Sequence, residues 1–179
     1  NPLPLAAFVD AIIMVEAEDV VAPVLTAIEG ASGKADAIDR LATIPHVFVP
    51  QHHGVVMPPV ARCEDTSLPA HSAIRTPDTE LSNMFLIESE RGCSRSCTYC
   101  VMRRSTNGGM RLVKKERLLE LIPEDASRVG LVGAAVSDHP KIVEILNTLA
   151  DRGSEVGLSS LRPDRLSDEL VGALHRVGY

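Results

Sequence analysis

The feature that most constrains the fold is a regular alternation of apolar strands and amphipathic helices over residues 83–178. Three apolar runs are each followed by a segment of helical periodicity: the runs span 83–90, 128–136 and 155–161, and the helices 113–122, 140–152 and 167–178. The middle run, RVGLVGAAV, is apolar throughout, which is typical of a strand buried on both faces. Strands connected through helices lie parallel and place their following loops at one edge. We therefore predict an α/β fold with a parallel sheet.

Three of the four cysteines occupy the loop after the first of these strands. The segment ERGCSRSCTYC places Cys93, Cys97 and Cys100 at C-x3-C-x2-C spacing, with Tyr99 directly before the third. Three thiolates on so short a loop can bind three corners of a cubane cluster and leave the fourth iron open. A structural zinc site asks for four protein ligands. A zinc site completed by Cys63 or His71 stays open as the alternative.

These residues resemble the signature of the radical S-adenosylmethionine enzymes. That signature is three cysteines at this spacing with an aromatic residue before the third, after the first strand of a full or partial βα barrel. The resemblance covers about residues 83–179 and implies that Cys93, Cys97 and Cys100 hold a 4Fe-4S cluster. It also implies that S-adenosylmethionine binds the open iron and is cleaved to a 5′-deoxyadenosyl radical, with Tyr99 near the adenine.

The same resemblance places further cofactor-binding residues at the ends of the second and third strands. The family's Gly-Gly-Glu element binds the cofactor's amino group at the end of the second strand, where this sequence reads GAAVSDHP. Ser137 and Asp138 are therefore expected to accept hydrogen bonds from the ammonium group; Asp138 as a helix cap is the alternative. Ser159, Ser160 and Arg162 are expected to reach the ribose or carboxylate, or Arg162 to be a solvated loop residue. We expect His139 at the surface.

Composition and charge narrow the functional classes. The chain is 45% hydrophobic and 23% charged with a net charge of −6, so its total charge does not indicate nucleic-acid binding. Eight basic side chains oppose one acid within 91–117, and they compensate cluster charge, form a solvated surface or steer RNA phosphates. The basic residues are Arg91, Arg95, Arg103, Arg104, Arg111, Lys114, Lys115 and Arg117. The absence of an apolar run long enough to span a bilayer, and of a secretion signal, predicts a cytoplasmic protein without a membrane partner.

The N-terminal part has a different pattern. Residues 9–15 read as a buried strand and 18–30 as a helix with acids in its first turn. They loosely resemble the end of the Rossmann-like cobalamin-binding domain that precedes many radical domains, although its Gly-Glu-Gly-Glu run here reads VEAE. Asp-x-His-x-x-Gly is absent, so cobalamin binding is left open, and His52 and His53 are expected at the surface. We divide the chain into a cobalamin-binding-like domain at 1–60, a linker at 61–82 and a partial barrel at 83–179.

The sequence therefore predicts part of a radical S-adenosylmethionine enzyme, cut at both ends. Its fold class is an α/β partial βα barrel of three units, preceded by the C-terminal part of a cobalamin-binding-type domain. Methyl transfer, ring formation and methylthio transfer to tRNA are all open, and the resemblance implies an electron donor such as flavodoxin or ferredoxin. The alternatives are a zinc-stabilised interaction module without catalysis, and an inert truncated fragment.

Overall fold

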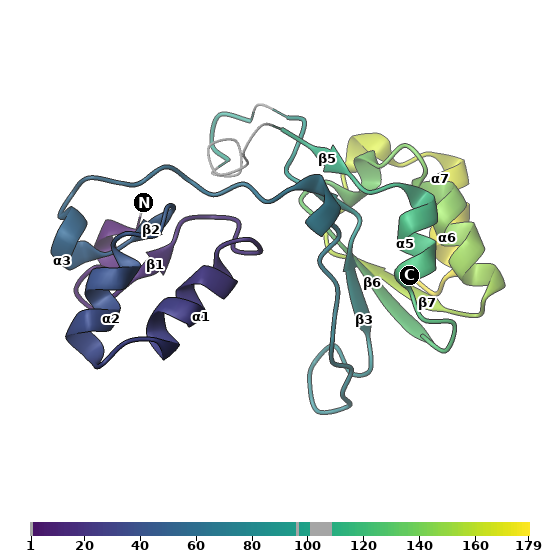
Figure 1. Ribbon diagram of the computed structural model, residues 1–179. Coiled ribbons are helices and arrows are strands. Elements are labelled where there is room, and N and C mark those ends of the chain that lie inside the picture. Colours follow the sequence, from purple (N-terminus) through teal and green to yellow (C-terminus); the bar gives the residue numbers. More distant parts are fainter. Residues whose placement is uncertain (1, 96, 101–108) are drawn as a thin grey trace. The chain divides into compact units, whose positions relative to one another are not determined.

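Three predicted strands come together as a parallel sheet in the second half of the chain. The computed structural model describes residues 2–95, 97–100 and 109–179. The chain divides into two units, residues 1–67 and 68–179, so the boundary falls inside the predicted linker. Figure 1 shows the elements of each unit. Arg103 and Arg104 of the predicted basic cluster lie outside the described residues.

The sheet of the second unit has the order β3-β6-β7 and is parallel throughout. The strands are β3 (Phe85–Glu88), β6 (Arg128–Val132) and β7 (Glu155–Leu158). Each lies within a predicted apolar run, at its start or centre. In this register Phe85, Val129 and Val156 stand side by side, and Ile87 and Leu131 form the next row. Alternate residues of a strand point to opposite faces, so these rows mark one face of the sheet.

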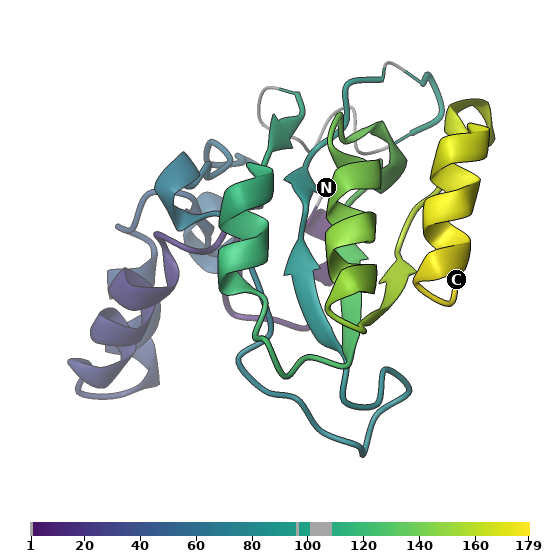
Figure 2. The ribbon, with the colours of Figure 1, turned by 90° about the vertical axis from the view of Figure 1, so that its right-hand side faces the viewer.

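Three helices cover that face (Figure 2). They are α5 (Lys115–Leu121), α6 (Ile142–Asp151) and α7 (Asp168–Arg176). The apolar side chains of α6 recur at three- and four-residue spacing, and Ile145, Leu146 and Leu149 are fully buried against the sheet rows. Helix α7 begins as predicted, because the Ser167 side chain accepts a hydrogen bond from the Leu170 N–H. The layer of helices therefore follows from the periodicity of the sequence.

A segment of the predicted linker pairs with the outer edge of the sheet. The Ser72 N–H donates to the Leu86 carbonyl at 2.8 Å, and the Glu88 N–H donates to the Ala70 carbonyl at 2.9 Å. His71 forms an antiparallel bridge with Ile87. The prolines of 58–80 argue against packed structure, but residues 70–72 contain none and satisfy backbone groups that an edge strand leaves open. The predicted linker is in this part a component of the sheet.

A short antiparallel ribbon closes the cysteine loop and is not anticipated by the sequence pattern. Strand β4 (Glu90–Arg91) pairs with β5 (Arg111–Leu112), two residues on each side. The two partners stand twenty residues apart and lack the alternation that marks a strand. The ribbon therefore fixes both ends of the cysteine loop beside the end of β3.

The first unit is built around two short strands and two helices. Strand β1 (Ile12–Ile13) pairs antiparallel with β2 (Val47–Phe48), and α1 (Val21–Glu29) and α2 (Lys34–Leu41) pack on one another. One further short helix, α3 (Pro50–His53), follows β2. The predicted strand at 9–15 is thus present only at its centre, and Val15 takes a left-handed φ of 77°. A β-branched side chain is strained in that conformation.

Helix α2 occupies a stretch that the small, polar composition of residues 30–40 does not predict. The Asp36 carboxylate accepts hydrogen bonds from the Ser32 N–H and from Arg40 one turn later. The hydrogen bond from Arg40, and then that from Ser32, holds the pKa of Asp36 well below its usual range. Ile38 and Leu41 supply the buried side of the helix. Local polar contacts and two apolar residues are sufficient to form this helix.

None of the helices in the described ranges combines the length and apolar character that a bilayer span requires. The surface carries ion pairs between neighbouring elements instead. Lys115 of α5 and Lys141 before α6 both contact Glu144 at 2.7 Å.

We expect Glu144→Gln to lower the stability of the second unit in a pH-dependent way. Hydrogen bonds from Lys115 and Lys141 lower the pKa of Glu144 from 4.5 to about 2. A depressed folded-state pKa stabilises the fold above the unfolded value, and this contribution is lost as the pH falls from about 4.5 towards 2. Urea unfolding at pH 6 should show the variant less stable, with the difference narrowing below pH ~4.5.

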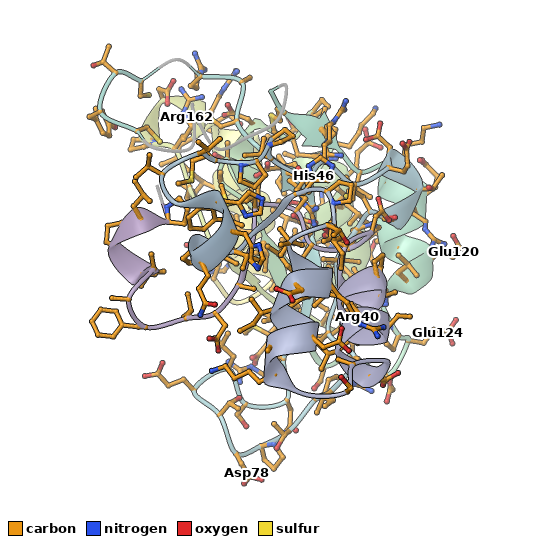
Figure 3. All side chains as sticks on the ribbon, turned by 60° about the vertical axis from the view of Figure 1, so that its left-hand side comes forward. Arg40, His46, Asp78, Glu120, Glu124 and Arg162 are labelled. Carbon is orange, nitrogen blue, oxygen red and sulfur yellow. The ribbon has the colours of Figure 1, made fainter. Side chains whose placement is uncertain are left out.

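Glu124→Gln supplies the matched control for this measurement. Glu124 is exposed in the turn after α5, and its label in Figure 3 marks a side chain at the surface. Removing its charge should leave the pH dependence of unfolding as it is in the unmodified protein. A Glu144→Gln difference that stays constant down to pH 3 would contradict the assignment of this ion pair.

Candidate functional site

The loops that follow β3, β6 and β7 meet at the carboxyl edge of the sheet. Parallel strands place their following loops on one side, and clefts for ligands form there in α/β proteins. Arg162, in the loop after β7, lies at this end of the second unit, and Asp78, before β3, lies at the opposite end (Figure 3). The predicted residues of all three loops are therefore neighbours in the fold.

The three loop cysteines are partly accessible. Cys97 is exposed, Cys93 and Cys100 are half-buried, and all three thiols are free of disulfides. The Arg95 N–H points at the Cys93 sulfur at 3.4 Å, and the Cys100 N–H donates to the Cys97 carbonyl at 3.2 Å. Backbone N–H groups directed at a thiolate sulfur stabilise its negative charge and tune a bound cluster.

Glu90 is buried directly before the cysteine loop. Its side chain has no exposed area, and its Oε1 accepts a hydrogen bond from the Ala135 N–H at 2.7 Å. Burial, reinforced by the charges of Glu88 and Asp138, raises the pKa of Glu90 despite the hydrogen bond from the Ala135 N–H. A carboxyl group in this setting is harder to ionise than one in water.

Gly133, at the end of β6, makes the space that Glu90 occupies. A Cβ added there would meet Glu90 Oε1 at 2.0 Å and Cδ at 2.6 Å. Two serines after β7 hold the same glycine from the other side. Ser159 Oγ bridges the N–H and the carbonyl of Gly133 at 2.9 Å each, and Ser160 Oγ donates to that carbonyl at 3.0 Å. Both serines, predicted as cofactor contacts, are used by the backbone of the β6 loop.

Asp138 is the centre of an ion-pair network across the three loops. Its side chain is 3% exposed and contacts Arg162 at 2.6 Å, Arg165 at 3.2 Å and Arg95 at 3.7 Å. Ser137 Oγ accepts from the Arg162 N–H at 3.0 Å. The sequence predicts Ser137, Asp138 and Arg162 as cofactor contacts, and in the structure they contact one another. Arg162 is half-buried and paired with two aspartates, so its reading as a solvated residue is wrong.

His139 is buried, so the expectation that it lies at the surface is wrong. Its Nδ1 accepts a hydrogen bond from the Lys141 N–H at 3.1 Å, which leaves Nε2–H to donate to the Val113 carbonyl at 2.9 Å. The ring thus connects the residue before α6 to the residue after β5. A polar side chain next to Pro140 looks exposed in the sequence, whereas here two backbone partners permit its burial.

Tyr99, the predicted adenine contact, is 89% exposed.

The two residues outside the loop that could complete a zinc site, His71 and Cys63, have other neighbours. His71 Nδ1–H donates to the Pro69 carbonyl at 3.2 Å. Cys63 is buried in the first unit, where its sulfur and carboxylate oxygens of Glu16 and Glu18 lie within 4.8 Å of one another. The sequence reading did not single out Glu16 and Glu18 as donors, because only the fold brings residue 63 beside them.

Comparison with known proteins gives one relative and no family. No protein-family model matches the chain. An uncharacterized protein of Methanocaldococcus jannaschii is 37% identical over 95 residues, which is 50% of this chain and 21% of that protein. The chain therefore spans about a fifth of the length of this relative. Function has to be argued from the site itself.

We expect Gly133→Ala to destabilise the protein by about 1–3 kcal/mol, because the new methyl group overlaps the Glu90 carboxylate. Gly172→Ala is the matched control, since a Cβ at this exposed position of α7 meets nothing within 4 Å. It should be neutral or stabilising by up to about 1 kcal/mol. Equal effects of the two substitutions in chemical unfolding would show that Gly133 makes no special space.

We expect Asp138→Asn to lower stability by about 1–3 kcal/mol, because it leaves three guanidinium groups without their shared anion. Solvent screens the charges of Arg165 and Arg95, which are partly exposed, so the loss stays at the lower end of what breaking a buried ion pair costs. Asp151→Asn removes an exposed partner of Arg176 that lies at 2.6 Å and should cost less than about 1 kcal/mol. Urea unfolding at neutral pH compares the two, and a cost at Asp138 no larger than at Asp151 would refute the network.

Proposed function

We propose that the protein is part of a radical S-adenosylmethionine enzyme whose 4Fe-4S cluster is held by Cys93, Cys97 and Cys100. The observation that carries the proposal is the position of the C-x3-C-x2-C loop. The loop follows the first strand of three parallel βα units, at the sheet edge where the loops after β6 and β7 also begin. On this proposal the second unit is the first part of a βα barrel, and the alternatives are a zinc module or an inert fragment.

The donor set fits an iron-sulfur cluster better than a closed zinc site. Three thiols come from one loop, and the other candidate donors have separate roles: Cys63 lies beside carboxylates, and His71 donates to a carbonyl. Three ligands leave one cluster iron free for an exchangeable ligand. When bound, the cluster and S-adenosylmethionine would supply reductive cleavage of the sulfonium carbon–sulfur bond and a radical that abstracts hydrogen from substrate.

The protein's own residues would position this chemistry. Arg95, between the first two cysteines, reaches Asp138 and Asp164, which ties the cysteine loop to the other two strand ends. The serines at 137, 159 and 160 fix the backbone of the β6 and β7 loops. Tyr99 is exposed at the loop and is proposed to pack on the adenine. These contacts would hold the β6 and β7 loops in fixed positions beside the cysteine loop.

The contacts of the basic residues around the loop argue against a phosphate-binding surface. Arg91 forms a bidentate pair with Glu88, and Lys115 pairs with Glu144, so part of the basic cluster is already neutralised. Binding of tRNA phosphates would need free cations on one surface. We therefore propose a cytoplasmic enzyme that draws its electron from a flavodoxin or ferredoxin, with tRNA as the less favoured substrate. The first unit is proposed as the end of a cobalamin-binding-type domain, and whether it binds cobalamin stays open.

Anaerobic reconstitution of the chain with iron and sulfide tests the proposal. The unmodified protein should become brown and give an electron paramagnetic resonance signal of a reduced cluster after dithionite. Each of Cys93→Ser, Cys97→Ser and Cys100→Ser should lose most of the bound iron, because a cubane held by two thiolates is labile. Cys63→Ser, which alters a buried thiol of the first unit, should keep it.

Three other outcomes separate the alternatives. A colourless protein with one zinc ion per chain, lost in the same three variants, would establish the zinc module. Iron retained in all three variants would overturn the ligand assignment. A reconstituted cluster with no 5′-deoxyadenosine formed from S-adenosylmethionine would show that this length of chain binds the cluster without catalysis.

A further inference from the structure

One oxygen of the Glu90 carboxyl group is buried without a hydrogen-bond partner. Oε1 is bound by the Ala135 N–H, whereas Oε2 has no partner, and it is the one buried side-chain nitrogen or oxygen in the described ranges of which this is true. Buried polar atoms in folded proteins are nearly always hydrogen-bonded, so an exception calls for an explanation, and a functional role is one of the usual ones. Glu90 lies at the base of the cysteine loop, at the carboxyl edge of the sheet.

The local structure is adapted to keep this carboxyl group in place. Gly133 lacks the Cβ that would collide with it, and Ser159 and Ser160 hold the Gly133 backbone. The Ala135 N–H fixes the orientation of the group at 2.7 Å. Neighbouring residues thus preserve an acceptor that contributes little to the stability of the fold, since burying one of its oxygens without a partner is unfavourable.

The charges around Glu90 favour a cation at Oε2. The two nearby acids already have their counterions: Glu88 pairs with Arg91, and Asp138 with Arg162 and Arg165. Glu90 forms no ion pair with any of the described residues. Ionised Glu90 would be buried beside these acids without a counterion, so a positively charged donor that reaches Oε2 would supply both the missing hydrogen bond and the missing counter-charge.

We propose that Glu90 accepts a hydrogen bond from a protonated amine of the bound ligand, and that in the proposed function this amine is the α-ammonium group of S-adenosylmethionine. The inference rests on the proposed function and replaces Asp138, whose carboxylate is occupied by three guanidinium groups. At the end of β6 the chain has Gly133-Ala134-Ala135, so the carboxylate comes from β4 on the adjacent strand end.

Access to Oε2 requires a movement of the surrounding residues, because the Glu90 side chain is fully buried. Glu90 belongs to a ribbon of only two residue pairs, β4 and β5. Short two-stranded ribbons are among the least stable parts of a fold and open at low cost. Ligand binding is therefore expected to accompany a shift of this ribbon.

Calorimetric titration of the cluster-loaded, oxygen-free protein tests the inference with two ligands. The first is S-adenosylmethionine, and the second is its analogue with hydrogen in place of the α-amino group. Glu90→Gln keeps the shape of the side chain and an oxygen for the Ala135 N–H, and it removes the charge. It should weaken binding of S-adenosylmethionine about ten- to a hundred-fold and leave binding of the analogue unchanged.

Glu124→Gln, the same charge removal in the turn before β6 at the opposite edge of the sheet, should bind both ligands like the unmodified protein. Equal binding of S-adenosylmethionine by Glu90→Gln and the unmodified protein would overturn this inference alone. Equal loss of both ligands in Glu90→Gln would also overturn it, because that pattern indicates general damage to the site. An unmodified, cluster-loaded protein that binds neither ligand would overturn the proposed function as well.

Discussion

The arrangement of the loops in the second unit depends on neutralising one buried charge, that of the Asp138 carboxylate at the carboxyl edge of the sheet. Asp138 is almost fully buried, and its charge is balanced by arginines from the cysteine loop and from the segment after β7. An uncompensated charge at that depth would cost several kcal/mol. Because the partners come from two other strand ends, satisfying one carboxylate fixes three loops relative to one another. The candidate site is a consequence of this requirement.

Backbone N–H and C=O groups at the same edge are hydrogen-bonded by side chains from a neighbouring loop. The N–H groups of Gly133 and Val136 after β6 donate to the hydroxyls of Ser159 and Ser160 after β7, and the Ser160 hydroxyl donates to the Gly133 carbonyl. The polar groups of these hydroxyls and of the Asp138 network are therefore paired with one another. Glu90 differs from them, because one of its oxygens is buried without a partner. This contrast, rather than proximity to the cysteines alone, makes Glu90 the residue of interest for ligand binding.

The parts of the fold that sequence reasoning placed are those with a strong local signal. The strands β3, β6 and β7 and the helices after them follow apolar runs and three-and-four spacing, and Ser167 caps α7 through its own hydroxyl. The parts it misplaced depend on partners far away in sequence. Residues 70–72 pair with β3, β4 pairs with β5, and His139 is buried because the Val113 carbonyl accepts its Nε2–H. The sequence around these residues does not predict which distant residue each one contacts.

The sequence by itself determined the three βα units and the clustering of three thiols after the first strand. Both are properties of contiguous residues, since hydrophobic periodicity and cysteine spacing act over a few turns of chain. Only the tertiary structure decided which carboxyl group is available to a ligand. Asp138 and Glu90 are both acidic residues that follow strands, and the sequence around them does not show which of the two can contact a ligand. Two arginines from the loop after β7 and one from the cysteine loop pair with Asp138. Gly133 leaves room for Glu90, whose Oε1 is bound by the Ala135 N–H and whose Oε2 has no partner among the described residues. Charge compensation in a folded protein depends on distances in space, and these are set when the strand ends come together.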